Sequence, residues 1–221
     1  MEDYLKAIYL VQQRNGEVTT SSLSEQLGGF KPGSVTGMIK KLAELNLVDH
    51  TPYQGVQLTE AGRKIALEVL RHHRLLELYL VEALGYSWDE VHEEAEALEH
   101  YISEKLESRI AARLGQPHFD PHGDPIPDPN GVLPNSSSLR LTDLSIGGSG
   151  RVVRVSDQHA DRLRYLADLG LVPGAVVTLI ESAPFEGPLS IQVGTAGPQH
   201  AIDRRLAHTI LIERDTVASQ S

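Results

Sequence analysis

The chain has 221 residues, no Cys, 30 acidic and 20 basic side chains, and a formal net charge of −10. This length favours two or three small domains, and 40% apolar with 23% charged residues excludes a chain that is disordered throughout. The lack of Cys excludes disulfides, thiolate metal sites and cysteine nucleophiles. No apolar stretch approaches the ~20 residues of a membrane span, and no signal-peptide core is present. We therefore expect a soluble, cytoplasmic protein with no membrane partner.

The net charge is unevenly distributed along the chain. Residues 1–75 contain nine Lys/Arg and eight Asp/Glu, a balance of +1, whereas residues 76–221 hold the remaining 11 basic and 22 acidic side chains, a balance of −11. A net charge of −10 argues against nucleic acid as a partner, but that argument applies to the second part alone. The asymmetry indicates that the two parts meet different partners.

Residues 1–62 have the pattern of a winged helix-turn-helix DNA-binding domain. A short amphipathic helix ends at Gly16, and a second helix, capped by Thr20 or Ser21, ends at Gly28. A third helix begins near Pro32, which the first turn of a helix accepts. Its apolar face is formed by Val35, Ile39, Leu42 and Leu45. The pattern then changes to period two at Val48, Val56 and Leu58, which predicts a β-hairpin.

The exposed face of the third predicted helix carries short polar and basic side chains. A helix that enters the major groove needs such donors near its N-terminus and cations further along for phosphates. The candidate DNA-contacting residues are Ser34, Thr36, Gly37, Lys40 and Lys41, with Tyr53 at the hairpin tip. The alternative is a plain helical hairpin, which the following β-hairpin and the basic face disfavour.

The rest of the chain is expected to form a helical domain, a linker and a small β-barrel. Residues 63–117 predict one helix from Arg63 to Leu84 and another that opens at a Ser87–Glu90 capping box and ends before Gly115. Residues 118–138, rich in Pro, Gly, Asn, Ser and Asp, predict a linker. Short β-like runs over residues 139–215, with one helix near 161–169, predict the barrel. The fold class is therefore multidomain and mainly α.

The densest chemical signal is a group of His and Glu residues in the helical region. His92, Glu96, Glu99 and His100 stand at i, i+4, i+7 and i+8, on one stripe of a helix beside an apolar stripe. Unpaired carboxylates at a buried seam are costly, and a cation would offset that cost. His73 and Glu77 form a second pair, i and i+4, on the preceding helix. A ligand set of N and O without S suits Mn²⁺ or Fe²⁺; the alternative is a solvated acidic face.

Three other histidines are expected at the surface. His72 projects about 100° away from His73 on a helix. His118 and His122 lie in the Pro-rich stretch.

The motifs MEDYLKAIY, SVTGMIKKL, LTEAGRKIA, RHHRLLE, HEEAEALEH, HGDPIP and LAHTILIE resemble, in this order, those of the diphtheria-toxin-repressor family of metal-dependent regulators. The resemblance implies a first domain that binds operator DNA, a second that dimerises and binds metal, and a third that is an SH3-like barrel similar to the ferrous-transport A domain. It implies a primary metal site of Asp3, Glu96, Glu99 and His100. It implies an ancillary site of His73, Glu77 and His92, and hence two metal ions per chain. Further candidate ligands in the barrel are Asp157, His159 and Asp161, for which a polar helix N-terminus is the alternative.

The resemblance also bears on the metal. Asp3 and Glu96 stand where the iron-responsive branch has Met and Cys, and hard oxygen donors shift the preference toward Mn²⁺ ahead of Fe²⁺. Lys6 stands where the manganese-responsive branch has a further carboxylate, and many members of that branch lack the third domain, so the site is a hybrid. We therefore expect a homodimeric repressor that binds double-stranded operator DNA when loaded with metal and controls genes of metal uptake or homeostasis.

Two other classes of function are weighed against this one. A dimetal-carboxylate helical-bundle enzyme with an appended DNA-binding-like domain needs E-x-x-H on two helices, but Glu99 and Ile102 stand three residues after Glu96 and Glu99. A winged-helix regulator with an organic ligand would leave the His and Glu stripe unexplained. No nucleotide-binding or hydrolase motif is present, so we expect no enzymatic activity.

Overall fold

The computed structural model describes residues 1–51, 55–135 and 137–214. Within them the chain divides into two units. The first unit comprises Met1–His73, Glu99–Ser103 and Pro127–Leu133. The second comprises Arg74–Leu98, Glu104–Ile126 and the chain from Pro134 onward. None of the helices described has the length and hydropathy that crossing a membrane would require.

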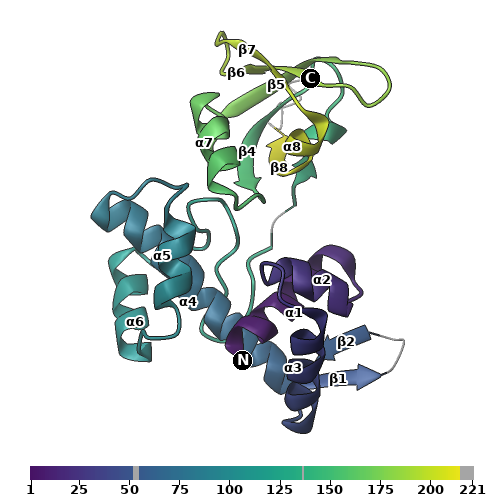
Figure 1. Ribbon diagram of the computed structural model, residues 1–221. Coiled ribbons are helices and arrows are strands. Elements are labelled where there is room, and N and C mark those ends of the chain that lie inside the picture. Colours follow the sequence, from purple (N-terminus) through teal and green to yellow (C-terminus); the bar gives the residue numbers. More distant parts are fainter. Residues whose placement is uncertain (52–54, 136, 215–221) are drawn as a thin grey trace, which may run out of the picture. The chain divides into compact units, whose positions relative to one another are not determined.

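The first unit contains the expected winged helix-turn-helix (Figure 1). Its elements are α1 (Glu2–Asn15), α2 (Thr20–Gln26), α3 (Pro32–Glu44), β1 (Val48–Thr51) and β2 (Gly55–Leu58). The two strands pair antiparallel in the register Val48↔Leu58 to Thr51↔Gly55. The hairpin tip, and with it Tyr53, lies outside the described residues.

Local sequence explains where these helices begin and end. The cap of α2 is Thr19, one residue before the predicted position, and it forms a capping box with Ser22. Pro32 occupies the first turn of α3, as predicted. Leu45 is not part of the apolar face: it follows the end of α3 and is 49% exposed, because the helix stops at Glu44.

One core joins the elements of the first unit. Leu5 and Ile8 of α1, together with Ile39 and Leu42 of α3, are at most 1% exposed. Side chains of α2, of both strands and of the beginning of α4 (Glu60–Leu84) complete this cluster. The orientation of α3 therefore depends on apolar packing against α1 and α2.

The predicted helix after the capping box is two helices. α5 (Val91–Leu98) and α6 (Glu104–Arg113) are separated by residues 99–103. The main-chain oxygen of Glu99 lies 3.1 Å from His72 Nδ1. This nitrogen is a partner for a carbonyl that has no N–H of a continuing helix to accept from. His72 is therefore a buried residue, 8% exposed, and not the surface residue that its position on the helix predicts.

The Pro-rich stretch is not a linker over its whole length. Asp120, His122, Asp124 and Ile126 are buried, and the carboxylate of Asp120 accepts hydrogen bonds from the main-chain N–H groups of His122 and Asp124. The main-chain oxygen of His122 accepts from Val155 of the barrel. Gly123, at φ +83°, has no room for a side chain, since an added Cβ would lie 1.9 Å from the oxygen of Val153. This turn is therefore a packed part of the second unit.

The barrel forms the end of the second unit (Figure 1). Its strands are β3 (Leu139–Arg140), β4 (Ser149–Val155), β5 (Val176–Ser182), β6 (Leu189–Val193), β7 (Gln199–Ile202) and β8 (Ile210–Arg214), and its helices are α7 (Ala160–Asp168) and α8 (Arg204–His208), with a 3₁₀ turn at Leu141–Asp143. All neighbours in the order β3-β8-β4-β5-β6-β7 pair antiparallel. The sequence pattern did not predict β7 or α8, because both are short and only partly apolar.

Gly62, in the first turn of α4, allows this helix to lie against the end of the helix-turn-helix. A Cβ at this position would stand 1.9 Å from the main-chain oxygen of Leu47. We expect Gly62→Ala to lower the free energy of unfolding by about 1–3 kcal/mol, as overpacking does, measured by urea denaturation followed by circular dichroism. Gly33→Ala in α3, where a Cβ meets nothing within 4 Å, is the control and should be neutral or stabilising. Equal stability of Gly62→Ala and wild type would contradict the close approach.

Candidate metal centres and DNA-binding surface

The first unit brings three of the predicted primary ligands together. Asp3 lies in the first turn of α1, and Glu99 and His100 lie in the segment that follows α5. Each offers one ligand atom, and these atoms all lie within 4.8 Å of one another. His100 Nε2 is 2.5 Å from Asp3 Oδ1 and 3.5 Å from Glu99 Oε1. We call this group the α1 cluster.

The α1 cluster is strongly negative at its exposed side. His100 Nδ1 lies 2.6 Å from Glu2 Oε2, and the side chains of Glu2 and Asp3 are about half exposed. Partial burial lowers the pKa of His100, but the hydrogen bond to Glu2 and the charges of Asp3 and Glu99 outweigh it and raise the pKa above its usual value. Each ring nitrogen of His100 therefore faces a carboxylate, Glu2 at Nδ1 and Asp3 at Nε2.

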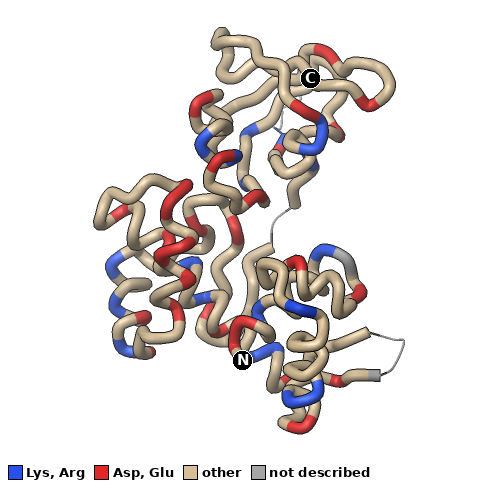
Figure 2. The backbone as a smooth tube through the Cα atoms, viewed as in Figure 1, with Lys and Arg blue, Asp and Glu red and all other residues tan. Residues whose placement is uncertain are grey.

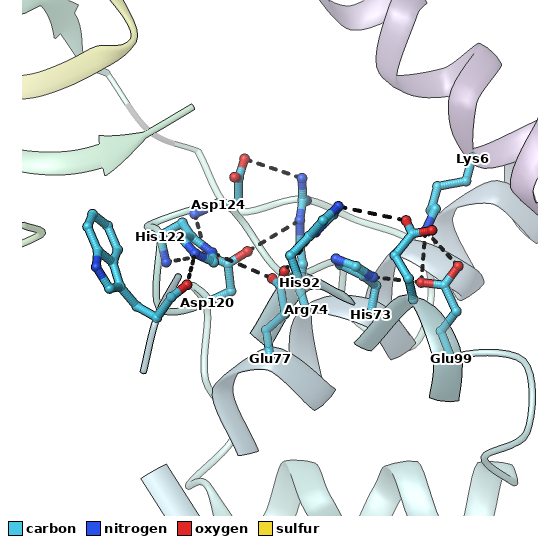
Figure 3. Close-up of polar contacts among 11 residues, drawn as sticks. Lys6, His73, Arg74, Glu77, His92, Glu99, Asp120, His122 and Asp124 are labelled. Atoms are coloured by element: carbon cyan, nitrogen blue, oxygen red, sulfur yellow. Dashed lines mark hydrogen bonds and ion pairs between the residues drawn. The ribbon is translucent and has the colours of Figure 1, made fainter. Parts of the chain in front are cut away.

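At the buried side of the α1 cluster, Glu99 has two further partners (Figure 3). Lys6 Nζ donates to both carboxylate oxygens, at 2.6 and 2.8 Å. His73 Nδ1 lies 2.6 Å from Oε2. The side chain of Glu99 is 0% exposed, so these contacts compensate a carboxylate that water does not reach.

Glu96, the fourth residue predicted for the primary site, belongs to the second unit. Its carboxylate is 48% exposed and lies 3.9 Å from His92 Nε2. The helix ends at Leu98, so Glu96 and Glu99 do not belong to the one continuous helix that the spacing predicts. A role for Glu96 as a ligand stays a prediction.

A second group of possible ligands surrounds Glu77 in the second unit (Figure 3). Glu77 is 1% exposed, and its carboxylate lies 3.2 Å from His92 Nδ1, as predicted, and 3.7 Å from His122 Nδ1. Asp120 joins them, 4.0 Å from the same nitrogen of His122. His73 stands one helical turn before Glu77 in α4. We call Glu77, His92, Asp120 and His122 the Glu77 cluster.

Asp120 and His122 are the residues that sequence reasoning missed. His122 was predicted at the surface but is 1% exposed, whereas His118 is exposed, as predicted. The signal was the D-x-H-x-D spacing in front of P-I-P, where a tight turn brings the side chains to one side. Asp157, His159 and Asp161 agree with the structural alternative: Asp157 accepts from His159 N and Arg162, and His159 and Asp161 are exposed.

The surroundings of His122 favour its charged form. Burial lowers the pKa, but the hydrogen bond to Glu77 and the charges of Glu77 and Asp120 raise it to about 9. Burial, followed by the charges of Asp124 and Glu77, raises the pKa of Asp120 well above its usual range. His122 Nε2 is 2.7 Å from the main-chain oxygen of Trp88, and the two rings are stacked.

Both clusters fit a divalent cation. They offer carboxylate oxygen and imidazole nitrogen and no sulfur, the donors that suit Mn²⁺ and Fe²⁺. In each cluster one glutamate is 1% exposed, which is a costly place for a carboxylate and is compensated in this structure by protein cations and imidazoles.

The candidate DNA surface lies on α3, where basic segments are visible in Figure 2. Ser34, Gly37, Lys40 and Lys41 are exposed. Thr36 is half-buried, and its hydroxyl donates to the main-chain oxygen of Pro32 at 3.0 Å, so it is the least available of the set. A Cβ at Gly37 would meet nothing within 4 Å, which leaves space for a close approach to a duplex.

Comparisons with known proteins agree with this architecture. Three family profiles match: the iron dependent repressor N-terminal DNA binding domain over residues 1–56, the iron dependent repressor metal binding and dimerisation domain over 59–128, and the FeoA domain over 139–214. Iron-dependent repressor IdeR of Mycobacterium tuberculosis is 31% identical over 96% of each chain. The diphtheria toxin repressor of Corynebacterium glutamicum is 27% identical and covers 96% of this chain and 95% of its own.

A solved structure described as a manganese-dependent transcriptional repressor in complex with manganese superposes with a TM-score of 0.90. It is 40% identical to this chain, and the match covers 97% of this chain and 99% of the other. These relatives are transcriptional repressors, which removes the ground for the dimetal-enzyme alternative. The chain belongs to the diphtheria-toxin-repressor family of metal-dependent transcriptional repressors.

Proposed function

We propose that this chain is a cytoplasmic, homodimeric repressor that binds a palindromic operator when Mn²⁺, or with lower preference Fe²⁺, occupies the α1 cluster, and that it controls genes of metal uptake or homeostasis. The convergence of Asp3, Glu99 and His100 from opposite parts of the chain carries this proposal. The all-N/O donor set supports Mn²⁺, and the name of the manganese-bound relative agrees with it.

The α1 cluster connects the winged helix-turn-helix with the segment between α5 and α6. Asp3 belongs to α1, whose apolar face packs in the same core as α3. Glu99 and His100 come from the segment between α5 and α6. A cation held by all three residues would therefore hold α1, and with it α3, in one arrangement relative to that segment. Metal then acts as a ligand that binds one conformation better than another.

The Glu77 cluster is proposed as a second metal site. His92 and Glu77 were predicted, with His73, from the sequence, and Asp120 and His122 are further candidate ligands on the same buried carboxylate. Two ions per chain would then offset part of the acidic excess of residues 76–221.

Dimerisation is proposed through the helical part of the second unit. The profile that matches residues 59–128 describes a metal binding and dimerisation domain, and the helices of this part expose large apolar side chains. These are Leu84, Leu98 and Leu106. A two-fold dimer would present two copies of α3 to two half-sites of an operator.

We expect metal to control DNA binding through Asp3. With a duplex selected from a random library in the presence of Mn²⁺, fluorescence anisotropy at fixed salt should show affinity about 10- to 100-fold lower in chelator, the size of a usual allosteric coupling. Asp3→Asn should bind DNA weakly with or without Mn²⁺. Glu17→Gln, an exposed carboxylate of the same unit, should respond as wild type. Affinity that chelator leaves unchanged would overturn the proposal.

We expect Lys40→Ala to weaken binding to all duplexes alike. An exposed lysine on α3 contacts phosphate in the proposed complex. Its loss should therefore make the negative slope of log K against log salt shallower by about one. The measurement is anisotropy over a salt series. A change of sequence preference with the slope retained would instead assign Lys40 to base recognition.

We expect the affinity for Mn²⁺ to fall as the pH is lowered from about 8 to about 6. The pKa of His100 is raised, so protons compete with metal for the imidazole more strongly at the lower pH, and the affinity rises with pH until His100 is neutral. Calorimetric titrations at the two pH values measure the effect. His100→Gln should bind more weakly and with a smaller pH dependence, and an unchanged dependence would remove His100 from the ligand set.

A further inference from the structure

The ammonium group of Lys6 is paired with the carboxylate of Glu99, one of the three residues of the α1 cluster. Lys6 and Glu99 are 93 positions apart, and their side chains are 8% and 0% exposed. Nζ donates to both oxygens of Glu99, at 2.6 and 2.8 Å, and His73 Nδ1 lies 2.6 Å from one of them (Figure 3). A buried carboxylate needs such compensation, because desolvation opposes its charge.

The same carboxylate is one of the three groups that converge for metal. Glu99 Oε1 lies 3.5 Å from His100 Nε2, which in turn lies 2.5 Å from Asp3 Oδ1. Lys6 Nζ is 2.6 Å from that same Oε1. A divalent cation bound to Glu99 would therefore meet a positive charge at close range on the buried side of the cluster, where the side chains of Lys6 and Glu99 are 8% and 0% exposed and screening is weak.

We propose that Lys6 is an internal counter-cation that competes with metal for Glu99 and thereby sets the metal concentration at which the repressor responds. This inference rests on the proposed function. The lysine side chain is long and flexible, so Nζ can withdraw from Glu99 while its stem stays packed in α1. Binding is then an exchange of one cation for another, and it breaks no covalent bond.

Lys6 also affects the protein when no metal is bound. Lys6 lies on the same helix as Asp3 and one turn after it. Its pair with Glu99 fastens α1 to the segment between α5 and α6 without metal. With Lys6 paired to Glu99, the first turn of α1 stays ordered when no metal is bound and does not fray.

The experiment is a calorimetric titration of Mn²⁺ into full-length wild type and Lys6→Met, which keeps the stem and removes the charge. We expect the dissociation constant to be at least about tenfold lower in Lys6→Met, because the competing charge is gone. Lys64→Met, which removes an exposed lysine from α4 in the same unit and changes the net charge equally, should match wild type. Equal or weaker binding by Lys6→Met than by wild type would overturn the inference.

Lys6→Met leaves Glu99 buried without its cation and is expected to be unstable without metal. Its thermal unfolding with and without Mn²⁺ provides a second readout: the rise in Tm on adding Mn²⁺ should be larger than in wild type. If the metal-free variant is unfolded, saturating Mn²⁺ should fold it, as followed by circular dichroism. A smaller rise in Tm, or failure of Mn²⁺ to fold the variant, contradicts the inference.

The two proposals fail in different ways. Wild type that binds no divalent cation overturns the proposed function. Wild type that binds Mn²⁺ in competition with a chelator, together with Lys6→Met that binds it no better, overturns the role of Lys6 alone. Lys6→Arg, which keeps a charge, should retain the weaker, wild-type-like affinity.

Discussion

The buried carboxylate of Glu99 is the point at which the chain's distant parts meet in the first unit. Its carboxylate accepts a hydrogen bond from Lys6 of α1 and lies within hydrogen-bond distance of His73 of α4. Its main-chain oxygen lies within hydrogen-bond distance of His72. A carboxylate without access to water requires polar or charged partners. The partners of Glu99 come from α1 and α4, so this one buried charge links both helices to the segment after α5. These contacts coincide with the end of α5 at Leu98, directly before Glu99.

The second unit repeats this principle with different chemistry. Glu77 is equally buried, but its partners are the imidazoles of His92 and His122, and Asp120 adds a further negative charge. The turn that carries Asp120 and His122 is fastened to the barrel through Val155 and lies against Trp88. A cation at Glu77 would therefore act on the surroundings of the barrel, whereas a cation at Glu99 would act on α1.

The local pattern of the chain was sufficient for most of the helix-turn-helix. Val35, Ile39 and Leu42 recur at helical spacing and are buried, and Pro32 marks the start of α3. Period and cap residues predict these features because they act within a few residues of the chain. The same reasoning failed at the break after Leu98, since the helical period of the sequence continues through Glu99 and His100 whereas the helix does not.

The sequence by itself determined the types of ligand, the absence of sulfur and the motifs that identify the family. Spacing was sufficient to single out Glu99 and His100 on one predicted helix and His73 with Glu77 on another, whereas Asp3 and the pairing of His92 with Glu77 came from the resemblance to the family. Only the tertiary structure showed that Lys6 compensates Glu99 and that Asp120 and His122 join Glu77. These contacts join residues far apart in the chain. A lysine has no local pattern that distinguishes a buried partner from a solvated side chain, and the D-x-H-x-D spacing indicates a tight turn at His122 but not that this turn meets Glu77. Burial and charge compensation are decided when the core closes.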